Sequence, residues 1–287
     1  MGFSLSGHRL APALSADSET DERWSDHETE VKSAMVDIET NPIPEEDRLE
    51  LLAKVRATLR SEPLLGPSFH LRDLRIEPDG ALVLDGEVPS VAAKKLALEH
   101  VAAAVPSATC IVDRLHVKPA VHMTDKEIRI HVRNALIADP ALRALEIWVV
   151  EDGEPQLFRG APEKPLGRIN VEVTNGVVIL NGHVPGLTSK RVAGVTAWWV
   201  PGVRDVFNGI EVDPPEEDSP ELIAEAVRAV LEMDPLVNAS QINVGIHGTQ
   251  VRLTGLVRTE AEAQAAERDA WCVFGVDTVI NHIKVEP

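Results

Sequence analysis

The sequence predicts an α+β fold of three tandem small sandwiches, each running α-β-β-α-β along the chain. Three observations predict this class. A turn, a short apolar run, a glycine and a valine recur three times in the same order. An acidic residue followed by proline ends each first helix, and each copy closes on a β-branched strand. A period held across three copies indicates repetition of one folding unit.

The predicted hairpins, at residues 79–88, 175–184 and 248–257, carry the repeat most clearly. Asp-Gly and Asn-Gly suit a tight turn because both central positions can take positive φ at low cost. The later glycine of each copy is expected to end the strand, where a side chain would obstruct a bend or a close backbone neighbour. From that glycine to the last valine of the copy the separations are 31, 30 and 30 residues. The glycines with an expected structural role are Gly80, Gly86, Gly176, Gly182, Gly202, Gly255 and Gly275.

Each unit is expected to begin with an amphipathic helix, which in the first unit runs from about Glu45 to Arg60. A residue before proline is pushed out of the α region, so each of these helices stops at such a residue. The three pre-proline residues are Glu62, Asp139 and Asp234. The second helices are expected to start near Ser90, Leu187 and Thr259.

These signals divide the chain into an acidic N-terminal arm, 1–44, and three units at 45–118, 122–213 and 217–287. The linkers between the units are short and contain proline, so they are expected to be stiff. The second unit is longer, and residues near 147–158 predict an extra hairpin. Insertions in repeat arrays often mark a contact face, and a solvated decoration explains this hairpin equally well.

The arm admits two interpretations. Its many acidic residues and few large apolar groups are typical of a disordered segment. Alternatively, apolar residues at helical spacing form a short amphipathic helix that docks on a unit or on a neighbouring subunit. The residues that would form its apolar side are Trp24, Val31, Met35 and Ile38.

Charge and hydropathy narrow the classes of partner. The formal net charge of −18 disfavours nucleic acid, whose phosphates need a basic footprint, and disfavours purely Coulombic binding to anionic lipid. No apolar run at the N-terminus is long enough for a signal peptide, and nothing elsewhere approaches a membrane span. A cytoplasmic location is therefore expected.

No catalytic motif is present: the chain lacks a G-x-S-x-G elbow, a P-loop and a dinucleotide fingerprint. The ten histidines show no H-E-x-x-H or other ligand spacing, and the two cysteines show no metal or redox spacing. We therefore expect no catalytic residue, no metal, no cofactor and no enzymatic activity.

Side-chain alternation along the hairpins points to contact surfaces. Val83 in the first unit, and Val177 with Ile179 in the second, are expected on the sheet face that the helices leave open, whereas the third unit offers polar residues there. Apolar outer faces are typical of contact with another domain or subunit. Tryptophans at the helix ends either pack there or serve a protein interface or the lipid headgroup region. The interface candidates are Trp24, Val31, Met35, Ile38, Val83, Trp148, Val177, Ile179, Trp198 and Trp199.

The hairpin G-x-V-x-L-x-G-x-V, a following helix and the closing V-x-G-V-x-x-V-x-N-x-I-x-V resemble the BON domain, a bacterial module named for an osmotically induced protein and nodulation proteins. The match is best at residues 200–210 and nearly as good at 273–281. In the first unit the Gly-Val turn is replaced at 106–108, and Asp113 stands where the later copies have asparagine.

The resemblance covers roughly residues 45–287 and implies, for each unit, a mixed three-stranded sheet with two helices on one face. It also implies binding without catalysis, often to phospholipid or envelope surfaces. Two hypotheses follow: a structural or adaptor protein that self-assembles as a homo-oligomer or docks on a larger protein assembly, and a monomeric stress protein that binds phospholipid or the envelope surface. Ion sensing is the least favoured hypothesis. A potassium-binding member of the family pairs this domain with a LysM domain, and no LysM-like segment occurs here.

Overall fold

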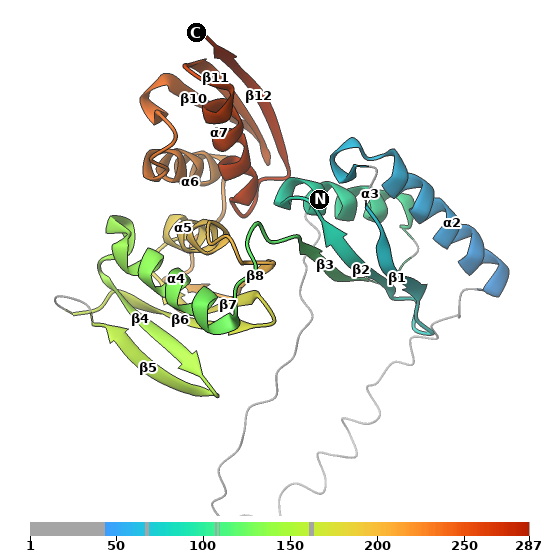
Figure 1. Cartoon of the computed structure of the whole chain (residues 1–287), viewed down its shortest axis with the longest axis horizontal. Coiled ribbons are helices and arrows are strands. Elements are labelled where there is room, and N and C mark those ends of the chain that lie inside the picture. Colours follow the sequence, from blue (N-terminus) through green and yellow to red (C-terminus); the bar gives the residue numbers. More distant parts are fainter. Residues whose placement is uncertain (1–43, 67–68, 107, 109, 161–163, 287) are drawn as a thin grey trace, which may run out of the picture. The chain divides into compact units, whose positions relative to one another are not determined.

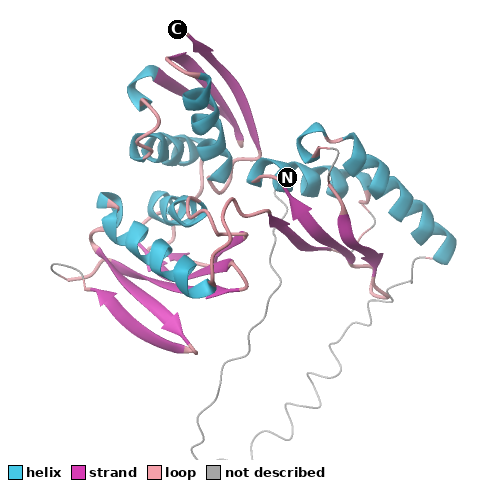
Figure 2. Ribbon diagram, in the orientation of Figure 1, coloured by secondary structure: helices cyan, strands magenta, loops and turns pink. Residues whose placement is uncertain are grey.

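The computed structural model describes residues 44–66, 69–106, 108, 110–160 and 164–286. Four interface candidates of the arm, Trp24, Val31, Met35 and Ile38, lie outside these ranges. The described chain is an α+β protein with six α-helices and three mixed sheets, so the predicted class is confirmed. Figure 2 shows the helices and strands of the described residues.

The helices are α2 (Glu45–Ser61), α3 (Val91–Ala104), α4 (Asp125–Ala138), α5 (Leu187–Trp198), α6 (Pro220–Met233) and α7 (Glu260–Cys272). The first sheet contains β1 (Leu71–Ile76), β2 (Leu82–Val88) and β3 (Ile111–Val117). The third contains β10 (Ile242–His247), β11 (Gln250–Val257) and β12 (Thr278–Val285). In the second sheet the order is β5 (Glu154–Arg159), β4 (Leu145–Glu151), β6 (Gly167–Thr174), β7 (Val177–Val184) and β8 (Asp205–Asn208), with β9 (Glu211–Val212) also paired to β7.

The three sheets share one pairing scheme. An antiparallel hairpin, β1–β2, β6–β7 or β10–β11, is followed by a helix and then by a strand that pairs parallel to the second hairpin strand. A parallel pair needs a long crossover, and α3, α5 and α7 supply it. The second sheet is wider because β4 and β5 add the predicted extra hairpin at its edge (Figure 1).

The first helices of the three units stop in the same way. The backbone of each pre-proline residue is extended, with ψ of 111°, 118° and 114° at Glu62, Asp139 and Asp234. Each carboxylate then accepts the backbone N–H two residues further on, at 2.9, 2.8 and 2.8 Å. The acid therefore satisfies the N–H donor of the turn that follows the helix.

The hairpin turn of the second unit has positive φ at both central residues, 54° at Asn175 and 76° at Gly176, as the Asn-Gly pair predicts. The later glycines differ from expectation: Gly182 and Gly255 lie inside β7 and β11 and do not end them. A Cβ on Gly255 would lie 2.0 Å from the Gln241 carbonyl oxygen. These glycines therefore let the antiparallel neighbour approach closely while the strand continues.

The other four structural glycines divide into two kinds. Gly80 and Gly275 have φ of 85° and 91°. At Gly86 and Gly202 space is limiting instead, since an added Cβ would lie 3.2 Å from the His70 carbonyl oxygen and 2.6 Å from the Met123 Cβ, respectively.

Each sheet packs one face against its helices. In the first unit Val55 and Leu59 of α2 meet Leu82, Leu84 and Leu115 of the sheet in one core. A second core runs without interruption through the second and third units and contains residues of α4, α5, α6 and α7. The second and third units therefore share apolar burial, whereas the first unit has a core of its own.

We predict that Gly255→Ala lowers the free energy of unfolding by about 3 kcal/mol or more. The positive φ is unfavourable for alanine, and the added Cβ overlaps the Gln241 carbonyl, so both effects destabilise the folded state. Gly248→Ala is the matched control: its φ is 60° but an added Cβ meets no atom within 4 Å, so only about 1 kcal/mol is expected. Urea denaturation checks both. Equal losses in the two variants would contradict the proposed role of close strand approach.

Candidate functional site

Apolar side chains lie in two groups on the face of the second sheet opposite its helices, and polar residues of β6, Asn170 and Glu172, separate the groups. Register places Trp148 beside Leu157 and Ile179 beside Phe207, while the alternate residues of β4 and β7 are buried in the core. Leu157 and Phe207 are 49% and 59% exposed, and Trp148, Val177 and Ile179 are half-buried. We call these five residues the outer face.

The corresponding faces of the other sheets differ. Val83 was expected on an open face, but its side chain is only 2% exposed. It lies on the central strand between Arg75 and Val112, and ion pairs with Asp73 and Glu77 hold the long Arg75 side chain nearby. In the third sheet the face carries Gln250 and Arg252 and is polar, as predicted.

Tryptophans at the end of α5 lie where the second unit meets the third. Trp198 and Trp199 are both half-buried and pack against the shared core. The Trp199 Nε1–H donates to Asp269 Oδ1 of α7 at 2.9 Å. The structure therefore places Trp199 against another unit of the same chain.

Basic residues at the fifth position of α3 and of α5 both reach the same loop of the third unit, residues 273–276. Lys95 Nζ donates to the Val273 and Val276 carbonyls at 3.0 and 2.8 Å, and burial lowers its pKa to about 8. The Arg191 side chain is 0% exposed; its Nε donates to the Phe274 carbonyl at 2.8 Å. Its Nη2 binds both oxygens of Asp218 at 2.7 Å. The fifth residues of α3 and α5 thus both bind the third unit.

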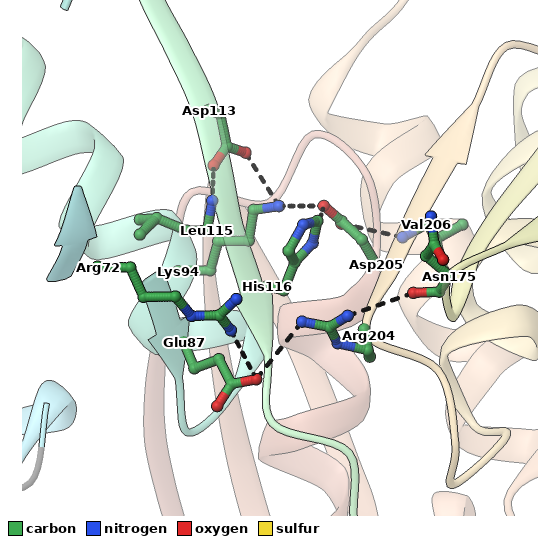
Figure 3. Close-up of polar contacts among 10 residues, drawn as sticks. All are labelled: Arg72, Glu87, Lys94, Asp113, Leu115, His116, Asn175, Arg204, Asp205 and Val206. Carbon is green, nitrogen blue, oxygen red and sulfur yellow. Dashed lines mark hydrogen bonds and ion pairs between the residues drawn. The ribbon is translucent and has the colours of Figure 1, made fainter. Parts of the chain in front are cut away.

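A second polar cluster joins the first unit to the second (Figure 3). Lys94 Nζ of α3 lies 2.9 Å from Asp113 Oδ2 and 2.5 Å from Asp205 Oδ2 at the start of β8. His116 Nδ1 is 3.6 Å from the same Asp205 oxygen. Burial pulls the pKa of Asp205 upward, but the nearby His116 imidazole and the charge of Lys94 outweigh it and hold the pKa below its ordinary value.

Beside this cluster, Glu87 Oε1 accepts from Arg72 at 2.9 Å and from Arg204 Nη2 at 3.4 Å (Figure 3). The Val117 backbone N–H donates to the Arg204 carbonyl at 2.8 Å. The end of β3 is thus attached to the residue before β8 through main chain as well as through side chains. The linker that follows is held too, since the Val121 N–H donates to the Pro201 carbonyl at 3.2 Å.

The first unit has Asp113 where the other two units have asparagine, and this difference accounts for the contact that Lys94 makes. Asn208 and Asn281 donate to the carbonyls of Lys190 and Ala263, the fourth residues of α5 and α7, at 2.8 and 3.1 Å. Asp113 has no amide to donate. The fourth residue of α3 is Lys94, whose ammonium replaces that donor and also has a proton left for Asp205.

Sequence reasoning missed these two clusters. The available signal was the replacement of asparagine by Asp113 together with basic residues at equivalent positions of the second helices. Which acid on another unit they would meet depended on the fold.

The chemistry of these arrangements suits binding. No group of three or more His, Cys, Asp or Glu side chains among the described residues could hold a metal ion. In the part of the chain that the structure describes, no helix is both long and apolar enough to cross a membrane. An open hollow of about 680 Å³ in the third unit is lined by residues such as Leu236, Leu256 and Arg258.

The model of the BON domain family matches residues 156–214 and 219–287. The outer membrane lipoprotein DolP of Haemophilus influenzae is 32% identical over 137 residues, which are 46% of this chain and 69% of that protein. A 21 kDa hemolysin of Actinobacillus pleuropneumoniae is 30% identical over 131 residues, 44% of this chain and 67% of that protein. A solved structure of the C-terminal domain of CdsD, a structural protein of the Type III secretion system of Chlamydia trachomatis, is 13% identical. The match covers 84% of this chain and 100% of that chain, with a TM-score of 0.22.

These relatives overturn the expected cytoplasmic location. The similarity to a protein described as an outer membrane lipoprotein points to the envelope. The expectation was wrong because it depended on the absence of an apolar leader, and the composition of a folded domain does not record the compartment in which it works.

We predict that Asp205→Asn lowers the free energy of unfolding by about 1–3 kcal/mol at pH 7, since Lys94 loses a partner in a largely buried place. The pKa of Asp205 is held low, so its stabilising contribution is present above the ordinary carboxyl pKa and is lost as pH falls through the folded value. The difference from wild type should therefore shrink below about pH 4. Chemical denaturation at several pH values measures the difference in free energy of unfolding between Asp205→Asn and wild type. Glu217→Gln, which changes an exposed acid, is the control. A difference that does not depend on pH would contradict the ion pair.

Proposed function

We propose that this chain, which belongs to the BON domain family, is a non-enzymatic binding protein of the bacterial envelope that self-assembles or docks on a larger protein through the outer face of its second sheet. The observation that carries the proposal is that face: two large apolar side chains, Leu157 and Phe207, are about half exposed there. Three half-buried apolar residues lie beside them. Exposed apolar side chains that are grouped on one face and bordered by polar residues are typical of protein contacts.

The extra hairpin supports a contact role. β4 and β5 supply Trp148 and Leu157, so the insertion adds a second apolar group to the outer face. A solvated decoration would instead need polar side chains on both faces. Of the two interpretations of the hairpin, we therefore favour the contact face.

We further propose that the chain carries three BON units, at 45–118, 122–213 and 217–287, after an arm at 1–44. The family model matches only within the second and third. Support for the first comes from its pairing scheme, an antiparallel hairpin followed by a parallel closing strand. Its departures, at 106–108 and at Asp113, fall where the family pattern is most specific, and Lys94 compensates for one of them.

The contacts between units support an adaptor. Asp205, Asp218 and the 273–276 loop each accept a hydrogen bond from a basic residue of another unit or from across a linker. A chain whose units are held in this way presents its surfaces to a partner with little loss of conformational freedom on binding. Location in the envelope is supported by the similarity to an outer membrane lipoprotein.

Binding of phospholipid by a monomer is the alternative. One observation favours it: the half-buried indole of Trp148 lies on the apolar outer face, and its Nε1–H donates to Glu146 at 3.1 Å. An amphipathic indole at the margin of an apolar surface suits the headgroup region. The net charge of −18 weighs against an anionic bilayer.

Phe207→Glu tests the proposal, because it charges the outer face at a 59% exposed position that the core does not need. We expect wild type to associate in a concentration series by size-exclusion chromatography with light scattering, and the variant to associate at least tenfold more weakly, about 1.4 kcal/mol. Leu49→Glu is the matched control, since Leu49 is 66% exposed but lies on α2 of the first unit.

A wild type that stays monomeric at every concentration would remove self-assembly. Flotation with zwitterionic and anionic vesicles would then decide the lipid alternative, with Phe207→Glu again compared with Leu49→Glu. Failure to float in all three proteins would remove that alternative as well.

A further inference from the structure

The face of the third sheet opposite its helices is basic, although the whole chain has a formal net charge of −18. Alternate residues of β10, β11 and β12 are buried in the core or packed against it, so the residues between them form this opposite face. None of these outward positions in the described strands is acidic. The basic residues among them, which we call the basic face, are His247, Arg252, His282 and Lys284. Arg252 and Lys284 form no ion pair with any described residue.

Protection of the sheet edge explains only part of this charge. A lysine on an edge strand, such as Lys284 on β12, discourages pairing with unrelated chains. Arg252, however, lies on the central strand between Gly245 and Ile280, and its side chain is exposed. A Cβ on Gly245 would lie 3.7 Å from the nearest atom, the Arg252 carbonyl oxygen, so packing does not require glycine there. The missing side chain leaves the guanidinium accessible to a carboxylate, its preferred planar partner.

The strand at the margin of the basic face has a free edge. Among the described strands β12 pairs with β11 alone, and Figure 1 shows it at one side of the third sheet. Its contacts are mainly with β11 and α7 of its own unit. On the helix side of this edge the apolar residues are incompletely covered, since Val279 and Ile283 are half-buried and Val285 is 39% exposed. A strand added here would meet basic residues on one side and apolar residues on the other.

The first unit shows that the equivalent edge accepts a chain segment. At the end of β3 the Val117 N–H donates to the Arg204 carbonyl at 2.8 Å, and beyond it the Val121 N–H donates to the Pro201 carbonyl at 3.2 Å. The two segments therefore run past each other in opposite directions. Val285 is the counterpart of Val117, because each ends the closing strand and pairs with the last residue of the central strand. Within the described residues, the main chain of β12 has no such partner from another unit.

We propose that the free edge of β12 binds an extended acidic segment of a partner protein by strand addition. Main-chain hydrogen bonds to β12 would hold the segment, and its side chains would point alternately to the two faces of the sheet. On one face its carboxylates would meet His282 and Lys284 and, one strand further in, Arg252. On the other face its apolar residues would cover Val279 and Ile283. The segment that fits this edge therefore alternates acidic and apolar residues.

The same surface is less suited to the other anionic macromolecules. Nucleic acid would be repelled by the net charge of −18, and the basic face offers no aromatic side chain on which a base could stack. The site also lies on a different sheet from the outer face, so it does not depend on what the outer face binds.

The test uses a blocked eight-residue peptide of alternating glutamate and valine, which matches β12 in length. Titration calorimetry with the full chain should detect binding, and amide hydrogen exchange in β12 should slow in the complex. Lys284→Glu and Arg252→Glu, both at exposed positions, should each bind roughly tenfold more weakly, because attraction is replaced by repulsion. Arg114→Glu is the matched control: it changes the net charge equally at an exposed strand position of the first sheet and should bind like wild type. Phe207→Glu should also bind like wild type, which separates this site from the outer face.

A second peptide of the same composition, with its glutamates and valines in separate blocks, keeps the charge but loses the alternation. It should bind roughly tenfold more weakly if the segment adds as a strand. Equal binding of the two peptides, no binding by wild type, or unchanged amide exchange in β12 would overturn the proposal. Anionic vesicles that bind through Lys284 when the peptide does not bind would assign the basic face to lipid and overturn it as well.

Discussion

The arrangement of the three units depends on buried basic side chains near the start of their second helices. A buried charge is tolerated only when it is paired or hydrogen-bonded. Arg191 is fully buried, and its Nε and Nη2 donate to the Phe274 carbonyl and to Asp218, both of the third unit. Lys94 and Lys95, adjacent on α3, likewise find partners in the second and third units. Separating the units would leave these charges without their partners, so the junctions are strongly favoured.

The same positions show how a repeated module acquires distinct roles. The fourth helix residue contributes its carbonyl to the asparagine amide in the second and third units, but in the first its ammonium replaces that missing amide and reaches Asp205. The tenth helix residue is histidine in the first unit, threonine in the second and aspartate in the third. The backbone plan thus stays constant while single side chains determine how each unit contacts its neighbour.

The surface left for partners is correspondingly uneven. Val83 is buried and the face of the third sheet is polar, whereas the second sheet exposes Leu157 and Phe207. The widened sheet concentrates apolar area in one unit, and junctions at α5 and β8 attach that unit to both neighbours. This distribution fits a binding protein of the envelope in which the first and third units position the second.

Local patterns in the sequence were sufficient for the α+β class, the hairpins, the helix stops at Glu62, Asp139 and Asp234, and the extra hairpin, because turns and helix ends depend on residues close along the chain. They also pointed to Ile179 and Trp199. Alternation along a strand says which face a residue occupies but not what lies over it, so the burial of Val83 and the exposure of Phe207 required the packed structure. The Lys94–Asp205 and Trp199–Asp269 contacts join residues far apart in the chain, and only tertiary structure brought them together.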